Sequence, residues 1–202
     1  MRAIRFFFFY PLSFIIKKIY QLRRFLYRVG YLKSRNLDIP VISIGNLAMG
    51  GTGKTPHTIL ISQLLDAHGF KNMILSRGYK GNLSHIGAEV LDTTKTSAYG
   101  DEPCLLKEKL ETTRVVIGAD RFASYEKFKQ DELVAIMDDG FQHLKLQRTF
   151  NIVLIDSNDS WYDSSVFPSG KYREDLSALE DADLIILTKA EINLNINRSM
   201  AR

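Results

Sequence analysis

The chain has 202 residues, 45% hydrophobic and 25% charged, which is typical of a globular protein long enough for one α/β domain. Its single cysteine, Cys104, excludes an internal disulfide framework and predicts a small buried thiol in a reducing compartment. The net charge of +4 is concentrated at one end of the chain, which argues against a broad nucleic-acid-binding surface.

That charge lies in residues 1–37, which contain nine Lys or Arg and no Asp or Glu, whereas the remainder contains 18 basic and 23 acidic residues. The apolar run 6–16 is shorter than the roughly 20 residues that span a bilayer. It is not expected to be a signal peptide, because Lys17-Lys18 follows it in place of a small-residue cleavage site.

After Pro11 the pattern becomes helical. Apolar residues recur on one face at three- and four-residue steps, and Lys17, Arg24 and Arg28 fall elsewhere; the apolar set is Leu12, Ile15, Ile16, Ile19, Leu22 and Leu26. Together with the phenylalanine run 6–9, this pattern favours a helix lying on an anionic membrane surface. The alternative is a helix whose apolar face packs on the domain core while its basic face is solvated.

The next predicted elements are a strand over 41–45 and a helix over 54–68, and a glycine-rich loop joins them. Its sequence is Ala48-Met49-Gly50-Gly51-Thr52-Gly53-Lys54-Thr55. Backbone N–H groups of such a loop and the following helix N-terminus bind phosphate, Lys54 reaches the terminal phosphates, and the Thr55 hydroxyl binds Mg²⁺. Ala48 replaces the first glycine of the strict pattern. A simple tight turn would not explain the remaining glycines and Lys-Thr, so these eight residues are predicted to bind a nucleotide.

The rest of the chain alternates between strands and helices. The further predicted strands are 72–76, 114–118, 133–138, 151–156 and 183–188, and the further helices are 102–111 and 120–130. Such alternation predicts an α/β fold, a parallel sheet with helices on both faces. Residues 157–182 are loop-rich with a short helical stretch near 174–181. The expected organisation is a membrane-associated segment 1–37, a nucleotide-binding domain 38–190 and a frayed tail 191–202.

Two adjacent carboxylates, Asp138 and Asp139, end the apolar strand 133–138. Ligands of doubly wound sheets bind at the carboxyl ends of the strands, so one carboxylate is expected to hold Mg²⁺ with Thr55. Neighbouring side chains of an extended strand point to opposite sides, so the other is expected to orient a neighbouring group.

Two further residues have alternative interpretations. His143, in the loop after Asp139, is either a ligand for substrate or phosphate or a structural histidine. Asp101 precedes a predicted helix, and the pattern alone favours an N-cap over a base near a reacting hydroxyl.

Three arginines follow predicted strands or lie in the loop-rich region: Arg77, Arg121 and Arg173. Each is either a ligand for the anionic groups of nucleotide or substrate or a surface residue. Lys189 at the end of the last strand, with Glu191, is a weak match to the guanine-binding pair of some nucleotide switches.

Taken in order, these motifs resemble the tetraacyldisaccharide 4′-kinases, which phosphorylate the lipid A precursor of Gram-negative bacteria. The resemblance covers roughly residues 5–190, and the matching segments are 44–47, 50–56, 76–79, 100–103, 118–121, 138–143 and 173–174. It implies a P-loop NTPase-like fold that uses ATP and Mg²⁺. It also implies transfer of the γ-phosphate to the 4′-hydroxyl of a lipid A disaccharide 1-phosphate.

The resemblance also implies residue roles and a location. Asp101 becomes the catalytic base, Asp138 and Asp139 become metal-site residues, and the active-site neighbours are Arg121, His143, Arg173 and Glu174. The location is the cytoplasmic face of the bacterial inner membrane, where the protein is peripheral. No obligate protein partner and no nucleic acid are expected.

Members of the family are longer than this chain, with a second lobe after the matching region. The chain is therefore expected to bind ATP–Mg²⁺ yet turn over poorly. Two other functions remain open at this point: a membrane-recruited nucleotide switch, and a non-catalytic remnant that binds membrane through residues 1–37.

Overall fold

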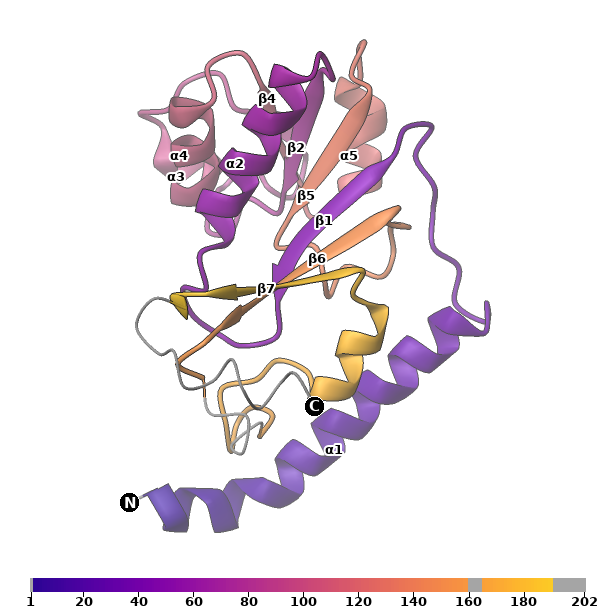
Figure 1. Ribbon diagram of the computed structural model, residues 1–202, viewed down its shortest axis with the longest axis vertical. Helices are drawn as coiled ribbons and strands as arrows, with labels where there is room; N and C mark the ends of the chain where they lie inside the picture. Colours follow the sequence, from indigo (N-terminus) through magenta and orange to yellow (C-terminus); the bar gives the residue numbers. More distant parts are fainter. Residues whose placement is uncertain (1, 160–164, 191–202) are drawn as a thin grey trace. The chain divides into compact units, whose positions relative to one another are not determined.

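The computed structural model describes residues 2–159 and 165–190, with residues 2–8 described by their backbone alone (Figure 1). The helices are α1 Arg2–Arg28, α2 Lys54–Ala67, α3 Thr96–Tyr99, α4 Asp101–Lys109, α5 Arg121–Phe128 and the 3₁₀-helix η2 Leu176–Asp181. The strands are β1 Val41–Asn46, β2 Asn72–Ser76, β3 Ala88–Glu89, β4 Arg114–Ile117, β5 Val134–Asp138, β6 Phe150–Asp156 and β7 Leu184–Thr188. Along the sheet their order is β3-β4-β2-β5-β1-β6-β7.

These elements confirm the α/β class and the six predicted strands. The two elements that sequence reasoning missed, β3 and α3, are two and four residues long, too short for an apolar period to show. β3 pairs antiparallel with β4, whereas the pairs β1–β5, β2–β4, β2–β5 and β6–β7 are parallel. The predicted tail 191–202 lies outside the described residues.

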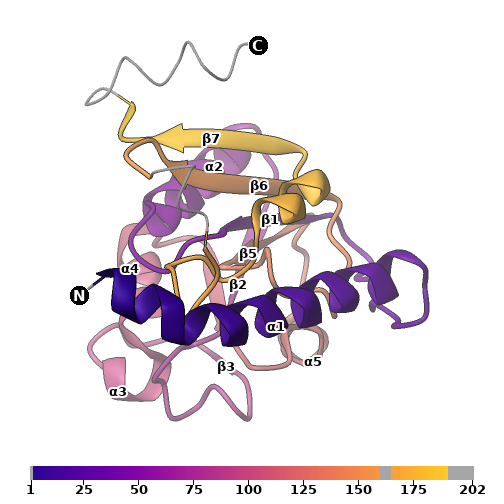
Figure 2. The same cartoon turned by 90° about the horizontal axis from the view of Figure 1, so that it is seen from below.

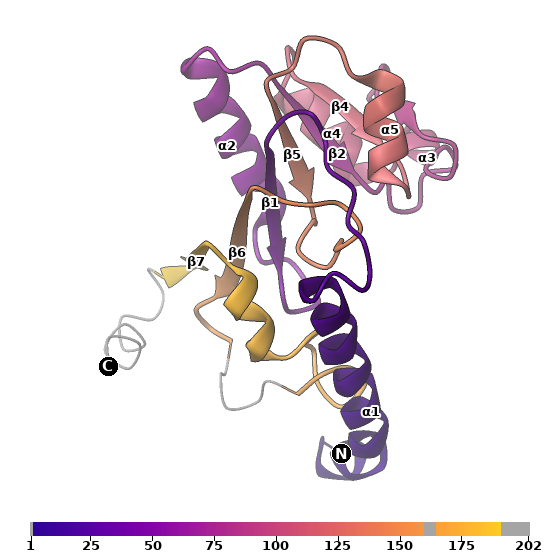
Figure 3. The same ribbon diagram turned by 90° about the vertical axis from the view of Figure 1, so that its right-hand side faces the viewer.

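The chain divides into two compact units. One unit, here called the sheet unit, comprises residues 34–45 and 53–151. Its parallel strands β1, β2, β4 and β5 are nearly continuous apolar runs, which is expected of strands that are buried on both faces. Figure 3 shows α2 and α5 on opposite sides of these strands, and α4 packs beside α2. The buried core includes Cys104, as predicted.

A close backbone approach fixes the loop that follows β5. A Cβ atom on Gly45, in β1, would lie 2.5 Å from the Cβ of Phe141, closer than two non-bonded carbon atoms approach each other. Phe141 is fully buried. Gly45 therefore allows the loop that carries residues 139–143 to lie directly against β1.

The other unit, here called the helix unit, comprises residues 1–33, 46–52 and 152–202. Figure 2 shows its strands β6 and β7 side by side, and α1 runs beside η2 in both Figure 2 and Figure 3. Helix α1 begins at Arg2, so the expectation that it starts after Pro11 was wrong. Proline removes one backbone hydrogen bond, but its fixed φ is compatible with a helix, so the helix continues through it.

The polarity of α1 is opposite to that of a helix packed on a core. Its apolar face is exposed, with Ile19 58% exposed and similar values for Leu12, Phe14, Ile15, Leu22 and Phe25. Within the helix unit most of this face is therefore not buried, and the choice between a membrane surface and the domain core stays a prediction. None of the described helices is long and apolar enough to cross a membrane.

Three basic residues of α1 contact carboxylates of the same unit. Lys17 Nζ lies 2.9 Å from Asp175, and Arg28 Nη2 lies 2.9 Å from Asp181. Arg24 pairs with both Glu174 and Asp181. These three cations thus have acidic partners within the helix unit, and contact of the basic face with anionic lipid stays a prediction. The acidic partners are Asp181 in η2 and the two residues before η2, Glu174 and Asp175.

Candidate active site

The phosphate loop has the backbone that its sequence predicts. Gly50 and Gly53 adopt positive φ values of 121° and 86°, a region that residues with a side chain rarely occupy. The Asn46 side-chain amide donates a 2.8 Å hydrogen bond to the Thr52 hydroxyl, and both residues are buried. Helix α2 then begins at Lys54, so its first N–H groups belong to the loop. This is the arrangement that binds phosphate oxygens.

Asp138, at the carboxyl end of β5, is a buried carboxylate, and among the described residues no cation lies within ion-pair distance of it, although the charges of Arg121 and Lys54 act on it from further away. It is 2% exposed, and its two oxygens accept hydrogen bonds from Thr58 (3.3 Å) and Ser76 (3.4 Å). Burial raises the pKa of Asp138 to about 6, and the nearby charges of Asp139 and Glu102 add to the effect. A buried carboxylate held only by hydroxyls leaves room for a bound cation to compensate its charge.

Lys54 and Asp139 form a pair beside this carboxylate. The Lys54 ammonium lies 3.7 Å from Oδ1 of Asp139, and the Lys54 side chain is largely buried. Asp139 adopts a φ of 48°, so the chain leaves the extended conformation directly after Asp138. The sheet unit thus brings together Lys54, Asp138 and Asp139, as the sequence predicted.

Arg121, the first residue of α5, extends from the end of β4 toward β5. It is 3% exposed, and its Nη2 donates to the backbone carbonyl of Asp138 at 2.9 Å. Burial lowers the pKa of Arg121 to about 10, against the raising effect of Asp138 and Asp139. Its Nε is buried and has no hydrogen-bond partner among the described residues, so this guanidinium retains a donor for a further acceptor. Asp120 orients the helix by capping it, accepting from Ala123 N–H at 3.1 Å.

Asp101, Arg77 and His143 lie in the sheet unit with different exposure. Asp101 is exposed and is the first residue of α4, whereas the N-cap position belongs to Gly100. The N-cap interpretation of Asp101 was therefore wrong. Gly100, with a φ of 94°, occupies the N-cap position of α4 instead. Arg77 is exposed, and its positive charge helps to lower the pKa of Arg121. His143 is half-buried.

The remaining predicted site residues belong to the helix unit. Arg173 is half-buried, and Glu174 is buried against Arg24. Lys189 is ion-paired with Asp156 at 2.5 Å, so the lysine of the weak guanine-binding match already has a protein partner. Its suggested companion, Glu191, lies outside the described residues.

Sequence reasoning missed Thr58 and Ser76, the two hydroxyls that hold Asp138. The available signal was weak: Thr58 lies one helical turn after Thr55, and Ser76 ends a strand that runs parallel to β5. No cluster of three His, Cys, Asp or Glu able to hold a metal ion occurs among the described residues. A Mg²⁺ ion in such a site would rely on Asp138, Asp139, the Thr55 hydroxyl, phosphate oxygens and water.

A parallel sheet, a glycine-rich loop entering a helix, and carboxylates at the end of a neighbouring strand together define an α/β protein of the P-loop NTPase class. The family model for tetraacyldisaccharide-1-P 4′-kinase matches residues 5–201. The chain belongs to this family.

Relatives and a solved structure agree with that assignment. The tetraacyldisaccharide 4′-kinase of Pelobacter propionicus is 43% identical over 89% of this chain, and that of Desulfotalea psychrophila is 41% identical over 89%. The crystal structure of the "apo" form of LpxK from Aquifex aeolicus in complex with ATP matches 92% of this chain and 59% of that chain. The TM-score is 0.82 and the identity 37%. The chain spans about half the length of the curated relatives, 51% and 53% of these two.

Proposed function

We propose that this chain carries the nucleotide site of a lipid-sugar kinase. In the proposed reaction, the ATP γ-phosphate passes to the 4′-hydroxyl of a tetraacyldisaccharide 1-phosphate, a precursor of lipid A. The observation that carries the proposal is the buried Asp138, only partly compensated by Arg121 and Lys54 and next to the Lys54–Asp139 pair, in a chain of this family. Phosphoryl transfer depends mainly on positioning and charge neutralisation, which these groups supply.

The proposed roles follow from the chemistry of each side chain. The amides of residues 48–55 would bind the phosphates, and Lys54 would exchange Asp139 for the terminal phosphate oxygens. The residues that fit a Mg²⁺ ion are Thr55, Asp138 and Asp139, because Asp138 is a buried acid whose charge lacks a partner within ion-pair distance among the described residues. Mg²⁺, when bound, would neutralise charge on the transferred phosphoryl group.

Other residues are proposed to act on the substrate. Asp101, exposed at the start of α4, would accept the proton of the sugar hydroxyl as the new P–O bond forms. Arg121 would hold the transferred phosphoryl group through its unpartnered Nε–H. His143 and Arg77 are proposed as polar ligands near this site, and Arg173 and Glu174 as substrate-binding residues.

The proposed location is the cytoplasmic face of the inner membrane, where the exposed apolar face of α1 would bind the lipid surface. Replacing Ile15 and Ile19 by Asp should abolish co-sedimentation with phosphatidylglycerol-containing vesicles. The matched control is Leu64→Asp, an exposed leucine of α2. Unchanged vesicle binding by the Ile15/Ile19 variant would contradict the location.

The kinase proposal is tested by transfer of labelled phosphate from ATP to a detergent-solubilised tetraacyldisaccharide 1-phosphate with Mg²⁺. The parent chain is compared with its Asp101→Ala and Lys54→Ala variants. Label in the lipid from the parent, lost in both variants, would support the kinase. ATP binding without label would indicate a chain that binds nucleotide but needs the remainder found in longer relatives. No ATP binding by the parent would overturn the proposal.

A further inference from the structure

Residues 171–173 of the helix unit form a short strand-like brace for the first half of the phosphate loop. The Met49 N–H donates a 2.8 Å hydrogen bond to the Lys171 carbonyl, and the Arg173 N–H donates a 2.7 Å bond to the Leu47 carbonyl. Between them, Ala48 and Tyr172 form an antiparallel bridge. The loop's first limb is thus held by main-chain bonds to a segment more than 120 residues later in the chain.

The residue that follows this brace is tied to α1. The Glu174 carboxylate is 1% exposed and accepts a hydrogen bond from the Arg24 guanidinium, which is itself 8% exposed. Arg24 is the only hydrogen-bond partner of the Glu174 side chain among the described residues, because its other oxygen has none. Glu174 therefore depends on Arg24 for compensation of its buried charge.

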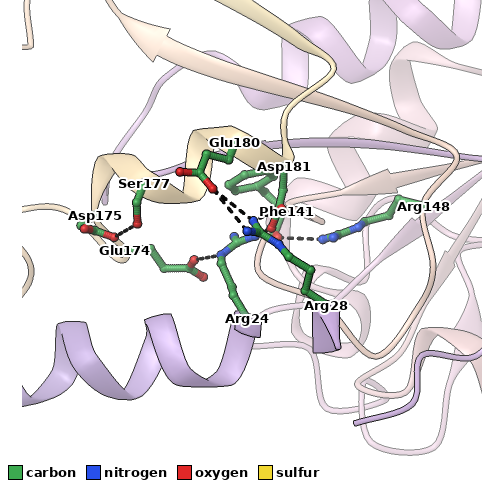
Figure 4. Close-up of polar contacts among 9 residues, drawn as sticks. All are labelled: Arg24, Arg28, Phe141, Arg148, Glu174, Asp175, Ser177, Glu180 and Asp181. Carbon is green, nitrogen blue, oxygen red and sulfur yellow. Dashed lines mark hydrogen bonds and ion pairs between the residues drawn. The ribbon is translucent and has the colours of Figure 1, made fainter. Parts of the chain in front are cut away.

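Arg24 also contacts the far end of η2. Its Nη1 donates to Asp181 at 2.5 Å, so one guanidinium joins Glu174, two residues before η2, to the last residue of η2 (Figure 4). A planar guanidinium can hold two carboxylates at once, which an ammonium group does poorly. In this way α1 fixes both ends of the element next to the brace.

Arg28, one turn later on α1, provides a natural contrast. It contacts Glu180 and Asp181 on the same acidic helix, yet both its side chain and that of Glu180 are more than half exposed (Figure 4). Exposed pairs contribute little, because water and salt screen them. The two arginines therefore share an element and an acidic partner but differ in burial and in contact with Glu174.

We propose that Arg24 is a positioning residue for the nucleotide site: through Glu174 it holds residues 171–173, and through them the phosphate-loop residues Leu47–Met49, in the conformation that binds phosphate. The inference rests on the proposed binding of ATP by this loop. Loss of Arg24 leaves the Glu174 carboxylate buried and uncompensated, so this residue is expected to move toward water and displace the adjoining brace.

The test compares ATP affinity and amide hydrogen exchange in the full chain for the parent, Arg24→Gln and the control Arg28→Gln. Arg24→Lys serves as a second variant that retains one positive charge if Arg24→Gln does not fold. We expect ATP affinity about tenfold weaker in Arg24→Gln, within the usual range of coupling between linked sites. Arg28→Gln should stay within about twofold of the parent, as expected for an exposed pair.

Hydrogen exchange separates positioning from a general loss of stability. Faster exchange is expected at the Met49 and Arg173 amides of Arg24→Gln or Arg24→Lys, with protection of β2 and β5 retained. ATP affinity and exchange equal to the parent would overturn the inference while leaving the nucleotide site intact. Equal acceleration across all strands would also overturn it, since that pattern reports global destabilisation. If the parent itself binds no ATP, the proposed function fails instead.

Discussion

Each unit of this protein buries charged side chains, and two of these, Arg24 in one unit and Asp138 in the other, have opposite environments. In the helix unit, Arg24 is matched by the carboxylates of Glu174 and Asp181. In the sheet unit, Asp138 is equally buried but is held only by the hydroxyls of Thr58 and Ser76. Its pKa is raised by burial to about 6, which means that its charge is poorly compensated.

The difference separates structural charges from functional ones. In a matched pair such as Arg24–Glu174 each charge compensates the other, so removing one partner should damage the fold around it. A poorly compensated acid such as Asp138 costs stability and persists where a ligand can complete it. The same contrast appears in arginines: Arg24 is paired with acids, whereas the Nε of Arg121 has no partner.

The largest effect is expected for Arg24→Met, which keeps an unbranched apolar stem and removes the charge. Glu174 is then left buried and unpaired, so a loss of about 3–5 kcal/mol in the free energy of unfolding is expected. Urea denaturation measures it. The double variant Arg24→Met/Glu174→Gln should recover a part, because no uncompensated carboxylate remains at this position. A loss below about 1 kcal/mol, the level of exposed pairs, would show that the pair is dispensable.

Asp138→Asn should change the free energy of unfolding in the opposite direction, because it should stabilise the protein. The pKa of Asp138 is raised above its ordinary value, so its protonated form stabilises the fold, and that stability is lost as pH rises through about 6. Without ligand, the free energy of unfolding of the variant should therefore exceed that of the parent by about 2–3 kcal/mol at pH 8 and by less than about 1 kcal/mol at pH 4. Thermal unfolding across this pH range measures the difference. The interpretation of Asp138 fails if the parent is the more stable at pH 8.

Gly45→Ala tests how the carboxylate loop is placed. The added methyl group would meet the Phe141 Cβ at 2.5 Å, and Phe141 is fully buried, so the loop or β1 must shift. Overpacking of this kind costs about 1–3 kcal/mol. Activity or ATP binding should fall in the same variant, because residues 138–143 move with Phe141. Gly69→Ala is the control, since no atom lies within 4 Å of its Cβ position, although its φ of 79° adds local strain.

Arg28→Gln should give the smallest effect. Its pKa is raised by the hydrogen bond with Asp181, but its side chain is more than half exposed. The expected change in the free energy of unfolding is below about 1 kcal/mol, and it should vanish at high salt. A change comparable to that of Arg24→Met would contradict the role assigned to burial.

The sheet unit could be predicted well from its sequence. Its strands are apolar runs bounded by turns, and the phosphate loop and Asp138–Asp139 follow them at fixed positions, so local pattern determines both fold and site. The hydroxyls of Thr58 and Ser76 could not be predicted, because they reach Asp138 from elements separated in sequence by 80 and 62 residues.

The orientation of α1 was beyond sequence reasoning for a related reason. An amphipathic pattern shows that two faces differ but not which of them meets the protein. The partners that decide it, Asp175, Glu180 and Asp181, lie about 150 residues later. They fall in a loop-rich region where no periodic signal points back to Lys17, Arg24 or Arg28.

The pairing of residues 47–49 with 171–173 has a consequence for synthesis of the chain. The glycine-rich loop leaves the ribosome early, but the main-chain partners of Met49 and Leu47 emerge only after more than 120 further residues have been made. Domains generally form from the amino-terminal end as they are synthesised, and contacts of long sequence separation form late. A nascent chain arrested before residue 171 would thus hold the loop's sequence without its brace.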